Sequence, residues 1–248
     1  MDITFESVTV FILACAETQL LQDTIQQTME SCPEAFLSKI VVVVPSAECP
    51  SYIYMQEVLK RDSTKKISVY IQKNKGLDMC LAELPAMVTG SHFVFMAADM
   101  EMDPHDLRTF VEKARLHPNR IIAASKWKDG STVIGYSALR KFCSCALNWI
   151  AGHLIHSKGT DLFTIYQIYP MRVYREMHFD DPRRFGYEYT LRPVRLGVEY
   201  EEIPTVYHKR TQGKTNFDFF ALFRVGLLYL LAAVRVRRMP VRKTMHNE

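Results

Sequence analysis

Three carboxylates stand at alternate positions after a strongly apolar run. The run 93–98 leads into Asp99, Glu101 and Asp103, and Pro104 follows. In extended chain alternate side chains point the same way, so Asp99 and Glu101 are expected to face one spot at the end of a strand. Open α/β sheets bind ligands there, and a hard cation relieves carboxylate repulsion. The pattern predicts a Mg²⁺ or Mn²⁺ site formed by Asp99 and Glu101, with Asp103 as a helix cap.

Predicted strands and helices alternate in the first half of the chain, and this order would bring the carboxylates to one edge of a sheet. The expected strands are 8–13, 39–44, 67–71, 91–98 and 120–125, and the expected helices are 18–31, 52–61, 77–88 and 104–116. Continuous apolar strands separated by helices predict a mostly parallel central sheet with helices on both faces. Right-handed crossovers then align the carboxyl ends of the strands along one edge.

The second half is less regular. A long helix is expected over 136–155, and weak alternation predicts a half-exposed strand over 164–169. A further strand is expected over 198–208, although it carries Pro204, and an apolar helix begins near Phe217. The two halves together predict an α/β protein.

Composition and charge limit the class of protein. The chain has 248 residues, of which 48% are hydrophobic, and its formal net charge is +4. This suits one sizeable core and permits an anionic ligand or membrane surface, and no nucleic-acid partner is expected. The six cysteines form no C-x-x-C pair and no secretion signal is recognised, which predicts reduced thiols in the cytoplasm. The most apolar stretch, 217–234, is short for a membrane span and contains Asp218 and Arg224.

Five motifs, the last of them a set of segments in the second half, occur in a recognisable order. They are VTVFILACAE (8–17), VVVVPSAE (41–48), QKNKGLDMCLAE (72–83), MAADMEMDP (96–104), and then Ser125–Trp127 with 160–170, 186–197 and 207–216. This order resembles the family 2 inverting glycosyltransferases of the GT-A fold, and within them the polyprenyl-phosphate sugar transferases similar to dolichyl-phosphate mannose synthase. The resemblance covers residues 7–220 and implies a GT-A nucleotide-diphospho-sugar transferase fold.

The resemblance also implies a set of residues that contact the nucleotide sugar. They are Ala14, Glu17, Ser46, Asn74, Gly76, Ala98, Asp99, Lys126 and Ser144. Two family positions differ: Ala97 replaces the first aspartate of the DxD motif, and Pro45 with Ser46 stands where the family has the aspartate that contacts the base. Since Mg²⁺ takes only one or two protein carboxylates beside phosphate and water, Asp99 and Glu101 suffice for the expected metal site.

The catalytic residues that the resemblance implies are Asp99, Arg140, Asp161, Glu188 and Arg210. A diphosphate leaving group needs cations, which Arg140 and Arg210 would supply. A hydroxyl acceptor would need Asp161 or Glu188 as a base, whereas a lipid phosphate needs none. The Glu-Asp pair that many relatives with hydroxyl acceptors carry is absent, which favours a phosphate acceptor.

The expected function is metal-dependent, inverting transfer of a sugar from a nucleoside-diphosphate sugar to a polyprenyl phosphate or a glycan, for lipid-linked sugars or cell-envelope polysaccharide. Residues 1–216 would form one catalytic domain, with a nucleotide-binding half (1–125) and an acceptor half (126–216). Residues 217–248 would form an amphipathic helix and a basic tail. The segment 217–243 would either contact the cytoplasmic face of a membrane or pack on the core. The oligomeric state is left open.

Two other functions remain open. A non-catalytic relative that binds nucleotide sugar is compatible with the substitutions at Ala16, Pro45 and Ala97. A sugar-phosphate nucleotidyltransferase shares the strand–helix alternation, but it requires a Gly-rich first loop followed by Arg and Lys. Residues 13–22 contain no such loop, which counts against this class.

Overall fold

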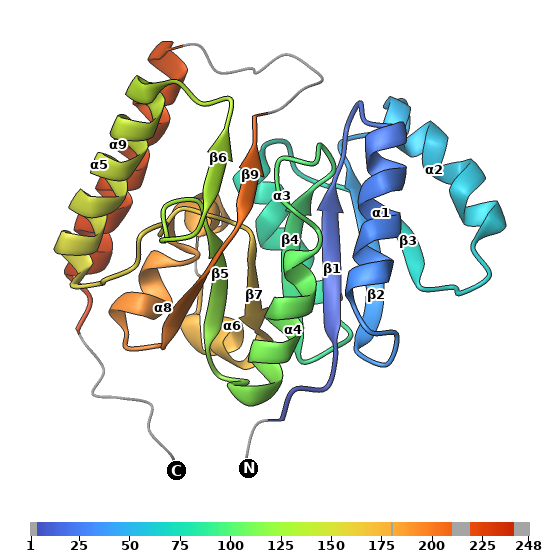
Figure 1. The fold of residues 1–248 in the computed structure, drawn as a ribbon, viewed down its shortest axis with the longest axis horizontal. Coiled ribbons are helices and arrows are strands. Elements are labelled where there is room, and N and C mark those ends of the chain that lie inside the picture. Colours follow the sequence, from blue (N-terminus) through green and yellow to red (C-terminus); the bar gives the residue numbers. More distant parts are fainter. Residues whose placement is uncertain (1–3, 180, 210–218, 241–248) are drawn as a thin grey trace.

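A seven-stranded sheet forms the centre of the protein, seen in a computed structural model that describes residues 4–179, 181–209 and 219–240 (Figure 1). Its strand order is β3 (Ile67–Ile71), β2 (Leu37–Val44), β1 (Val8–Leu13), β4 (His92–Ala97), β7 (Gln167–Pro170), β5 (Ile121–Ser125) and β8 (Tyr200–Pro204). Only β7 runs antiparallel to its neighbours within this sheet. The predicted α/β class with a mostly parallel sheet is confirmed.

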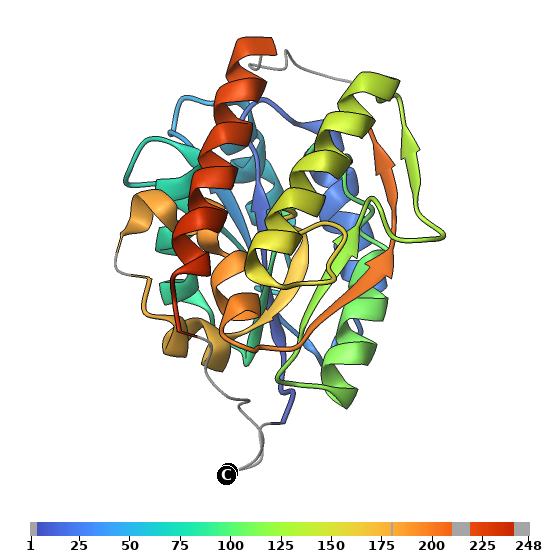
Figure 2. The same cartoon turned by 90° about the vertical axis from the view of Figure 1, so that its left-hand side faces the viewer.

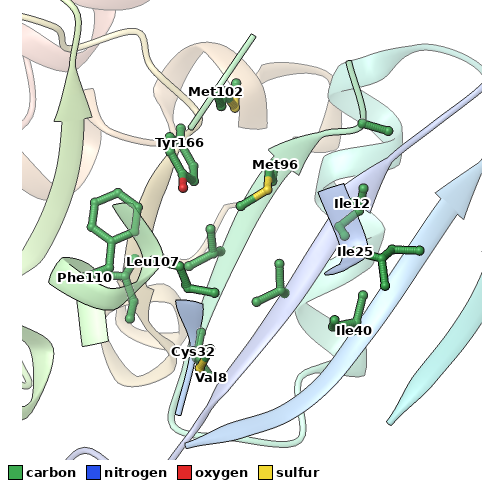
Figure 3. Close-up of a cluster of buried hydrophobic side chains, with 14 of the residues drawn as sticks. Val8, Ile12, Ile25, Cys32, Ile40, Met96, Met102, Leu107, Phe110 and Tyr166 are labelled. Carbon is green, nitrogen blue, oxygen red and sulfur yellow. The ribbon is translucent and has the colours of Figure 1, made fainter. Parts of the chain in front are cut away.

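Helices cover both faces of the sheet, because the strand side chains are apolar in both directions. One face packs against α1 (Gln19–Ser31), α2 (Pro50–Arg61) and α4 (Asp106–Leu116), and Figure 3 shows Ile12, Ile25 and Phe110 among the buried side chains there. The other face packs against α3 (Leu77–Glu83), α6 (Met171–Met177) and α7 (Phe185–Glu188). The expected coverage of both faces is confirmed.

A third cluster joins α5 (Ala138–Ile155), α8 (Leu191–Arg195) and α9 (Phe219–Arg237). Figure 2 shows α5 and α9 side by side on the outside of the molecule. The small side chains of Ala151, Ala232 and Ala233 are buried between these helices, and small residues permit close helix packing. Within the described residues, no helix combines the length and the apolar character that crossing a bilayer requires.

Several expected elements differ from the observed ones. The strand expected to be half-exposed is β7, which is fully buried because it lies between β4 and β5 with both faces covered. The strand expected over 198–208 divides after Pro204, and β9 (Val206–His208) pairs instead with β6 (Thr132–Ile134), which was not expected. The helix expected over 77–88 ends at Glu83 and continues as a 3₁₀ turn.

Asp106, at the start of α4, accepts a hydrogen bond from the Thr205 hydroxyl and thereby ties α4 to the segment between β8 and β9. Burial raises the pKa of Asp106 from 3.8 to about 6. A carboxyl group with a raised folded-state pKa binds more protons in the folded protein, so its burial opposes folding increasingly as the pH rises through about 6.

We therefore expect the variant Asp106→Asn to be more stable than the wild type at alkaline pH. The advantage should shrink by about 1–2 kcal/mol between about pH 8 and about pH 5, because the wild-type carboxyl group becomes protonated. Urea unfolding of both proteins across this range measures the difference, in which the shared contributions of other groups cancel. Parallel stability curves would rule out a raised pKa for Asp106.

Candidate functional site

The carboxyl ends of the parallel strands bring the predicted residues to one edge of the sheet, at the top of Figure 1. Leu13 at the end of β1 is in register with Ala97 at the end of β4. The Ala98 N–H donates to the Leu13 carbonyl at 2.9 Å, and the Ala14 N–H donates to the Val43 carbonyl at 2.9 Å. The loops after β1, β2 and β4 therefore begin side by side, which is the arrangement expected of a ligand-binding edge.

The acidic segment after β4 is a turn and not an extension of the strand. β4 ends at Ala97, and Met100 adopts a left-handed conformation with φ of 58°. Asp99 is buried, and its Oδ1 accepts the Glu101 N–H at 3.1 Å. The expectation that alternate carboxylates align along extended chain is therefore wrong, and it is the turn that brings Asp99 and Glu101 together. Asp103 precedes α4 by three residues and accepts the His105 N–H at 3.0 Å.

Tyr207 on β9 holds Glu101 from the other side. Its hydroxyl donates to Glu101 Oε2 at 2.9 Å, and the N–H of His208 donates to the Glu101 carbonyl at 3.1 Å. Burial, followed by the charges of Tyr136 and Glu101, raises the pKa of Tyr207 well above its usual value. The tyrosine therefore remains a hydrogen-bond donor, and a carboxylate that accepts such a bond is oriented by it.

Lys126, which directly follows β5, joins this group. Its Nζ lies 2.6 Å from Asp161 Oδ2 and 4.9 Å from the centre of the Tyr207 ring. The Asp161 carboxylate is buried and also accepts the Lys126 backbone N–H at 3.2 Å. The Asp161 N–H donates to Glu202 on β8 at 2.7 Å. This network fixes the ammonium group of Lys126 beside Tyr207.

Arg140, near the start of α5, reaches the same group through a second tyrosine. Its guanidinium carbon lies 3.7 Å from the centre of the Tyr136 ring, and Nη2 donates to the Tyr136 hydroxyl at 3.0 Å. The rings of Tyr136 and Tyr207 meet edge to face with their centres 5.8 Å apart. Ser144 lies one turn further along α5, where its carbonyl accepts from the Asn148 side chain. Arg140 and Lys126 thus approach Tyr207 from two elements.

The remaining predicted nucleotide contacts lie in the loops after β1, β2 and β3. Glu17 is buried, and its Oε2 accepts the N–H groups of Cys15 at 2.8 Å and Ala16 at 3.0 Å. Ser46 accepts the Glu48 N–H, and Asn74 donates its side-chain amide to Glu83. Gly76 precedes α3 with φ of 99°, a conformation that favours glycine. These loops follow neighbouring parallel strands and so share one edge.

Glu188 does not join this group. It is fully buried on α7, where Oε2 lies 2.7 Å from Arg192 Nη2 and Oε1 lies 3.0 Å from Arg235 Nη1. Among the described residues, no hydrogen bond or ion pair connects Glu188 to Tyr207, or to the residues that contact Tyr207. Arg210, which was expected to close over the leaving group, lies outside the described residues.

The chemistry of the site suits a hard cation. Asp99 and Glu101 offer carboxylate oxygens from one turn, and Mg²⁺ commonly binds through one or two such groups beside phosphate oxygens and water. The described part of the chain contains no cluster of three or more His, Cys, Asp or Glu suited to a metal ion. The two carboxylates would therefore supply only part of the coordination shell of such an ion.

Two tyrosines at the centre of the group, Tyr136 and Tyr207, were not among the predicted site residues. Tyr207 is 106 positions from Glu101, its hydrogen-bond partner. The short strands β6 and β9 pair with each other and carry the flanking segments into contact. The sequence offers one signal for Tyr207, which is its place as the first residue of the basic segment 207–216, at the end of a predicted strand that contains Pro204.

Solved structures share this fold over nearly the whole chain. Glucosyl-3-phosphoglycerate synthase from Mycobacterium tuberculosis, in complex with Mn²⁺, uridine diphosphate and glucosyl-3-phosphoglycerate, matches with a TM-score of 0.63 at 10% identity. The match covers 95% of this chain and 81% of that one. A mannosyltransferase from Pyrobaculum calidifontis, in complex with GDP-Man and Mn²⁺, matches with a TM-score of 0.62 at 11% identity, over 94% of this chain and 65% of that one.

No protein-family model matches the chain. The similarity to the M. tuberculosis synthase covers 95% of the chain, so it extends over both halves of the sheet. The GT-A fold expected from the sequence is therefore confirmed.

Proposed function

We propose that this protein is a metal-dependent inverting glycosyltransferase of the family 2, polyprenyl-phosphate type, which moves a sugar from a nucleoside-diphosphate sugar to a phosphorylated acceptor. The observation that carries the proposal is the group around Tyr207, where two carboxylates (Asp99, Glu101) and two cations (Lys126, Arg140) meet at the carboxyl edge of a GT-A sheet. Carboxylates suit the metal, and cations suit the phosphates of both substrates.

The donor half would bind the nucleotide through the loops after β1 to β4. We assign this role to Ala14, Glu17, Ser46, Asn74, Gly76 and Ala98. Glu17 would support nucleotide binding indirectly, because its carboxylate accepts two backbone N–H groups and thereby holds the shape of the loop after β1. Gly76 has no heavy atom within 4 Å of the position of a Cβ, and the absence of a side chain would let a ligand approach the backbone of this turn closely.

The reaction breaks the bond between the anomeric carbon and the β-phosphate oxygen, and the electron pair leaves with the nucleoside diphosphate. An acceptor phosphate oxygen forms the new bond from the opposite face. A divalent cation bound by Asp99, Glu101 and the diphosphate would supply charge neutralisation of the leaving group. Arg140 and Lys126 hold positive charge at fixed positions beside this centre, and preorganised charge stabilises a transition state more than mobile solvent does. Arg210 is proposed to add a third cation.

A phosphate acceptor fits the state of the two candidate bases. Asp161 is paired with Lys126, and Glu188 is held by two arginines, so neither carboxylate is placed to remove a hydroxyl proton. An ionised phosphate has no proton to lose and needs no general base. The M. tuberculosis synthase has been crystallised with phosphoglyceric acid, so a protein of this fold can hold a phosphorylated molecule beside its nucleotide. We therefore assign positioning roles to Asp161 and Glu188.

Tyr207 should control activity through Glu101. The variant Tyr207→Phe removes the hydroxyl that donates to Glu101 Oε2 but keeps the ring beneath Lys126. We expect the Mn²⁺ concentration that gives half-maximal transfer to rise about tenfold, because the loss of a partner of a metal-binding carboxylate typically weakens metal binding by this amount. Titration of the transfer rate with Mn²⁺ measures this effect. Tyr54→Phe, which removes a hydroxyl on α2 that contacts Gln22, is the matched control and should leave the titration unchanged.

We further propose that α9 and the basic tail, within residues 217–243, bind the cytoplasmic face of a membrane, so that 1–216 acts as the catalytic domain. One face of α9 packs on the core through Ala232, Ala233 and Val236. The other face exposes apolar side chains, which are Leu227, Leu228, Leu231 and Val234. The helix has no acidic residue and carries arginines, a composition that favours anionic lipid.

Sedimentation with vesicles tests this membrane contact. The wild type should bind phosphatidylglycerol vesicles and should bind phosphatidylcholine vesicles more weakly. Leu227→Gln together with Leu231→Gln should reduce binding by at least about tenfold, since two apolar side chains are lost from the surface. Equal binding by the double variant would show that α9 does not contact the lipid.

The function itself is tested by a panel of nucleotide sugars in a thermal-shift assay with Mg²⁺ or Mn²⁺. A donor that binds the native protein raises its apparent stability by about 2.7 kcal/mol at a hundredfold excess over its dissociation constant. We expect one nucleotide sugar to stabilise the wild type only with metal. Stabilisation without any transfer to an acceptor would instead support the alternative function, a non-catalytic protein that binds nucleotide sugar. The replacement of the first DxD aspartate by Ala97 is compatible with that alternative.

A further inference from the structure

Strand β8 carries two adjacent glutamates, Glu201 and Glu202, whose side chains point to opposite faces of the sheet because successive strand residues alternate. On one face, Glu201 Oε1 lies 2.5 Å from Lys113 Nζ on α4, and Oε2 lies 3.3 Å from Arg120 Nη1. On the other face, Glu202 forms no ion pair with any residue that the structure describes. It instead accepts hydrogen bonds from the segment that follows α5.

The carboxylate of Glu202 holds two consecutive residues of that segment through three donors. The backbone nitrogen of Thr160 lies 2.8 and 2.9 Å from its two oxygens, and the Thr160 hydroxyl donates to Oε2 at 2.9 Å. The Asp161 N–H donates to Oε1 at 2.7 Å. Successive backbone N–H groups that converge on one anion form a nest, and hydrogen bonds to a charged acceptor are stronger than those between neutral groups. This contact therefore fixes the backbone of both residues.

The same contact extends to the end of β5 through Ser125. A carboxylate can only accept, so the single proton of the Thr160 hydroxyl points to Glu202, and Ser125 Oγ, 2.6 Å away, donates to Thr160. Ser125 Oγ in turn accepts the backbone N–H groups of residues 127 and 128, both at 3.1 Å. Glu202 is thereby connected to the turn in which Lys126 lies.

Asp161 connects Glu202 to the side chain of Lys126. The backbone of Asp161 is held on both sides, since its N–H donates to Glu202 and its carbonyl accepts the Tyr200 hydroxyl at 2.8 Å. Its carboxylate is buried and lies 2.6 Å from Lys126 Nζ, and the Lys126 side chain is only 15% exposed. A lysine has a flexible four-carbon stem, so a fixed partner is what limits the positions of its ammonium group.

Glu202 itself does not contact the group around Tyr207. In the described part of the chain, no hydrogen bond or ion pair joins its carboxylate to Lys126 or to Tyr207. Both of its oxygens already accept from residues 160 and 161. Its influence on Lys126 therefore passes through the segment 160–161.

We propose that Glu202 is a positioning residue for sugar transfer, which fixes residues 160 and 161 and so holds the ammonium group of Lys126 where the phosphates of the substrates bind. This inference rests on the proposed function and adds to it a residue that touches no substrate. Charge that is already in place stabilises a transition state better than charge that must first be reoriented. Misplacement of a catalytic group by about 1 Å can lower a rate about 10²-fold.

Competitive acetylation of lysines, followed by peptide mapping, reports the position of Lys126 without requiring transfer activity. In Glu202→Ala, acetylation of Lys126 should be several times faster than in the wild type, because Asp161 is no longer held, and Lys113 should be unchanged. In the matched control Glu201→Ala the pattern should reverse, since Lys113 loses its partner and Lys126 keeps its own. An unchanged rate at Lys126 in Glu202→Ala would overturn the proposal.

Two conservative variants separate the hydrogen bonds of Glu202 from its charge. Glu202→Gln keeps the length of the side chain, and its amide oxygen can still accept the two N–H groups, so Lys126 should stay protected from acetylation. Glu202→Asp keeps the charge but is one methylene shorter, so acetylation of Lys126 should rise. The reverse order would show that only the charge matters and would overturn the proposal, and neither variant removes the carboxylate or amide that the fold accommodates.

Transfer kinetics test the consequence for the reaction. Glu202→Ala should lower kcat about 10²-fold, whereas Glu201→Ala should keep the wild-type kcat. In a Lys126→Ala background, Glu202→Ala should lower kcat no further, because two residues that act through one group are not additive. Additive losses would overturn the proposal. A wild type that transfers no sugar, but in which Glu202 protects Lys126 from acetylation, would overturn the proposed function and leave Glu202 as the residue that places Lys126.

Discussion

Replacing Asp99 with Asn is expected to lower sugar transfer roughly 10²–10³-fold, the loss typical when one group that stabilises developing charge is removed. Asn keeps an oxygen that can accept the Glu101 N–H, so the turn after β4 should keep its shape. It removes the negative charge, which together with that of Glu101 would bind the cation. The measurement is the initial rate of transfer as a function of Mn²⁺ concentration, with folding checked by the melting temperature.

Asp103→Asn is the matched control, because this carboxylate belongs to the same acidic segment. Its Oδ1 accepts from the backbone and side chain of His105, and an amide oxygen can do the same. We expect transfer close to the wild-type rate. Equal losses in the two variants would mean that the segment matters only for its total charge, and a wild-type rate in Asp99→Asn would remove that residue from the mechanism.

Replacing Glu188 with Ala is expected to cost about 3–5 kcal/mol of unfolding free energy, the range measured when one partner of a buried ion pair is lost. Glu188 is completely buried, and its two carboxylate oxygens are held by Arg192 and Arg235. Arg192 is itself only 12% exposed, so its guanidinium would be left without this counter-charge in a poorly solvated position. Chemical denaturation, with the slope compared between variants, measures the change.

Glu188→Gln separates this structural role from a chemical one. The amide oxygen can still accept one hydrogen bond, so the loss of stability should be smaller than in Glu188→Ala. Transfer by the folded fraction should remain within about tenfold of the wild type. A hundredfold or larger fall in kcat, with unchanged stability, would instead make the carboxylate a participant in the reaction and would argue for a hydroxyl acceptor.

The sequence predicted most accurately the elements whose environment is uniform along the chain. β1, β2 and β4 are continuous apolar runs because both of their faces are covered, and this pattern needs no knowledge of distant residues. β7 was misinterpreted as half-exposed because of its polar residue Gln167, which is paired with Thr190 in the buried interior. Such a pairing depends on tertiary contacts that local pattern does not contain.

In the candidate site, too, the residues set by local pattern were predictable, and those set by tertiary contacts were not. Asp99, Glu101 and Lys126 were predictable as candidates because they directly follow strands, whose carboxyl ends share an edge in any parallel sheet. Tyr136 and Tyr207 were not, because their place depends on the pairing of two three-residue strands, β6 and β9. The partners of Glu188 also come from distant positions, since Arg235 is separated from it by 47 residues.

The most direct test of the account is the transfer reaction itself. The donor identified by thermal shift is incubated with farnesyl phosphate, with and without Mn²⁺, and the product is examined by mass spectrometry and NMR. The account predicts a glycosyl phosphate lipid with inverted anomeric configuration, formed by the wild type only with metal and nearly absent with Asp99→Asn. Donor binding without transfer to farnesyl phosphate, or transfer to a hydroxyl acceptor in its place, would contradict it.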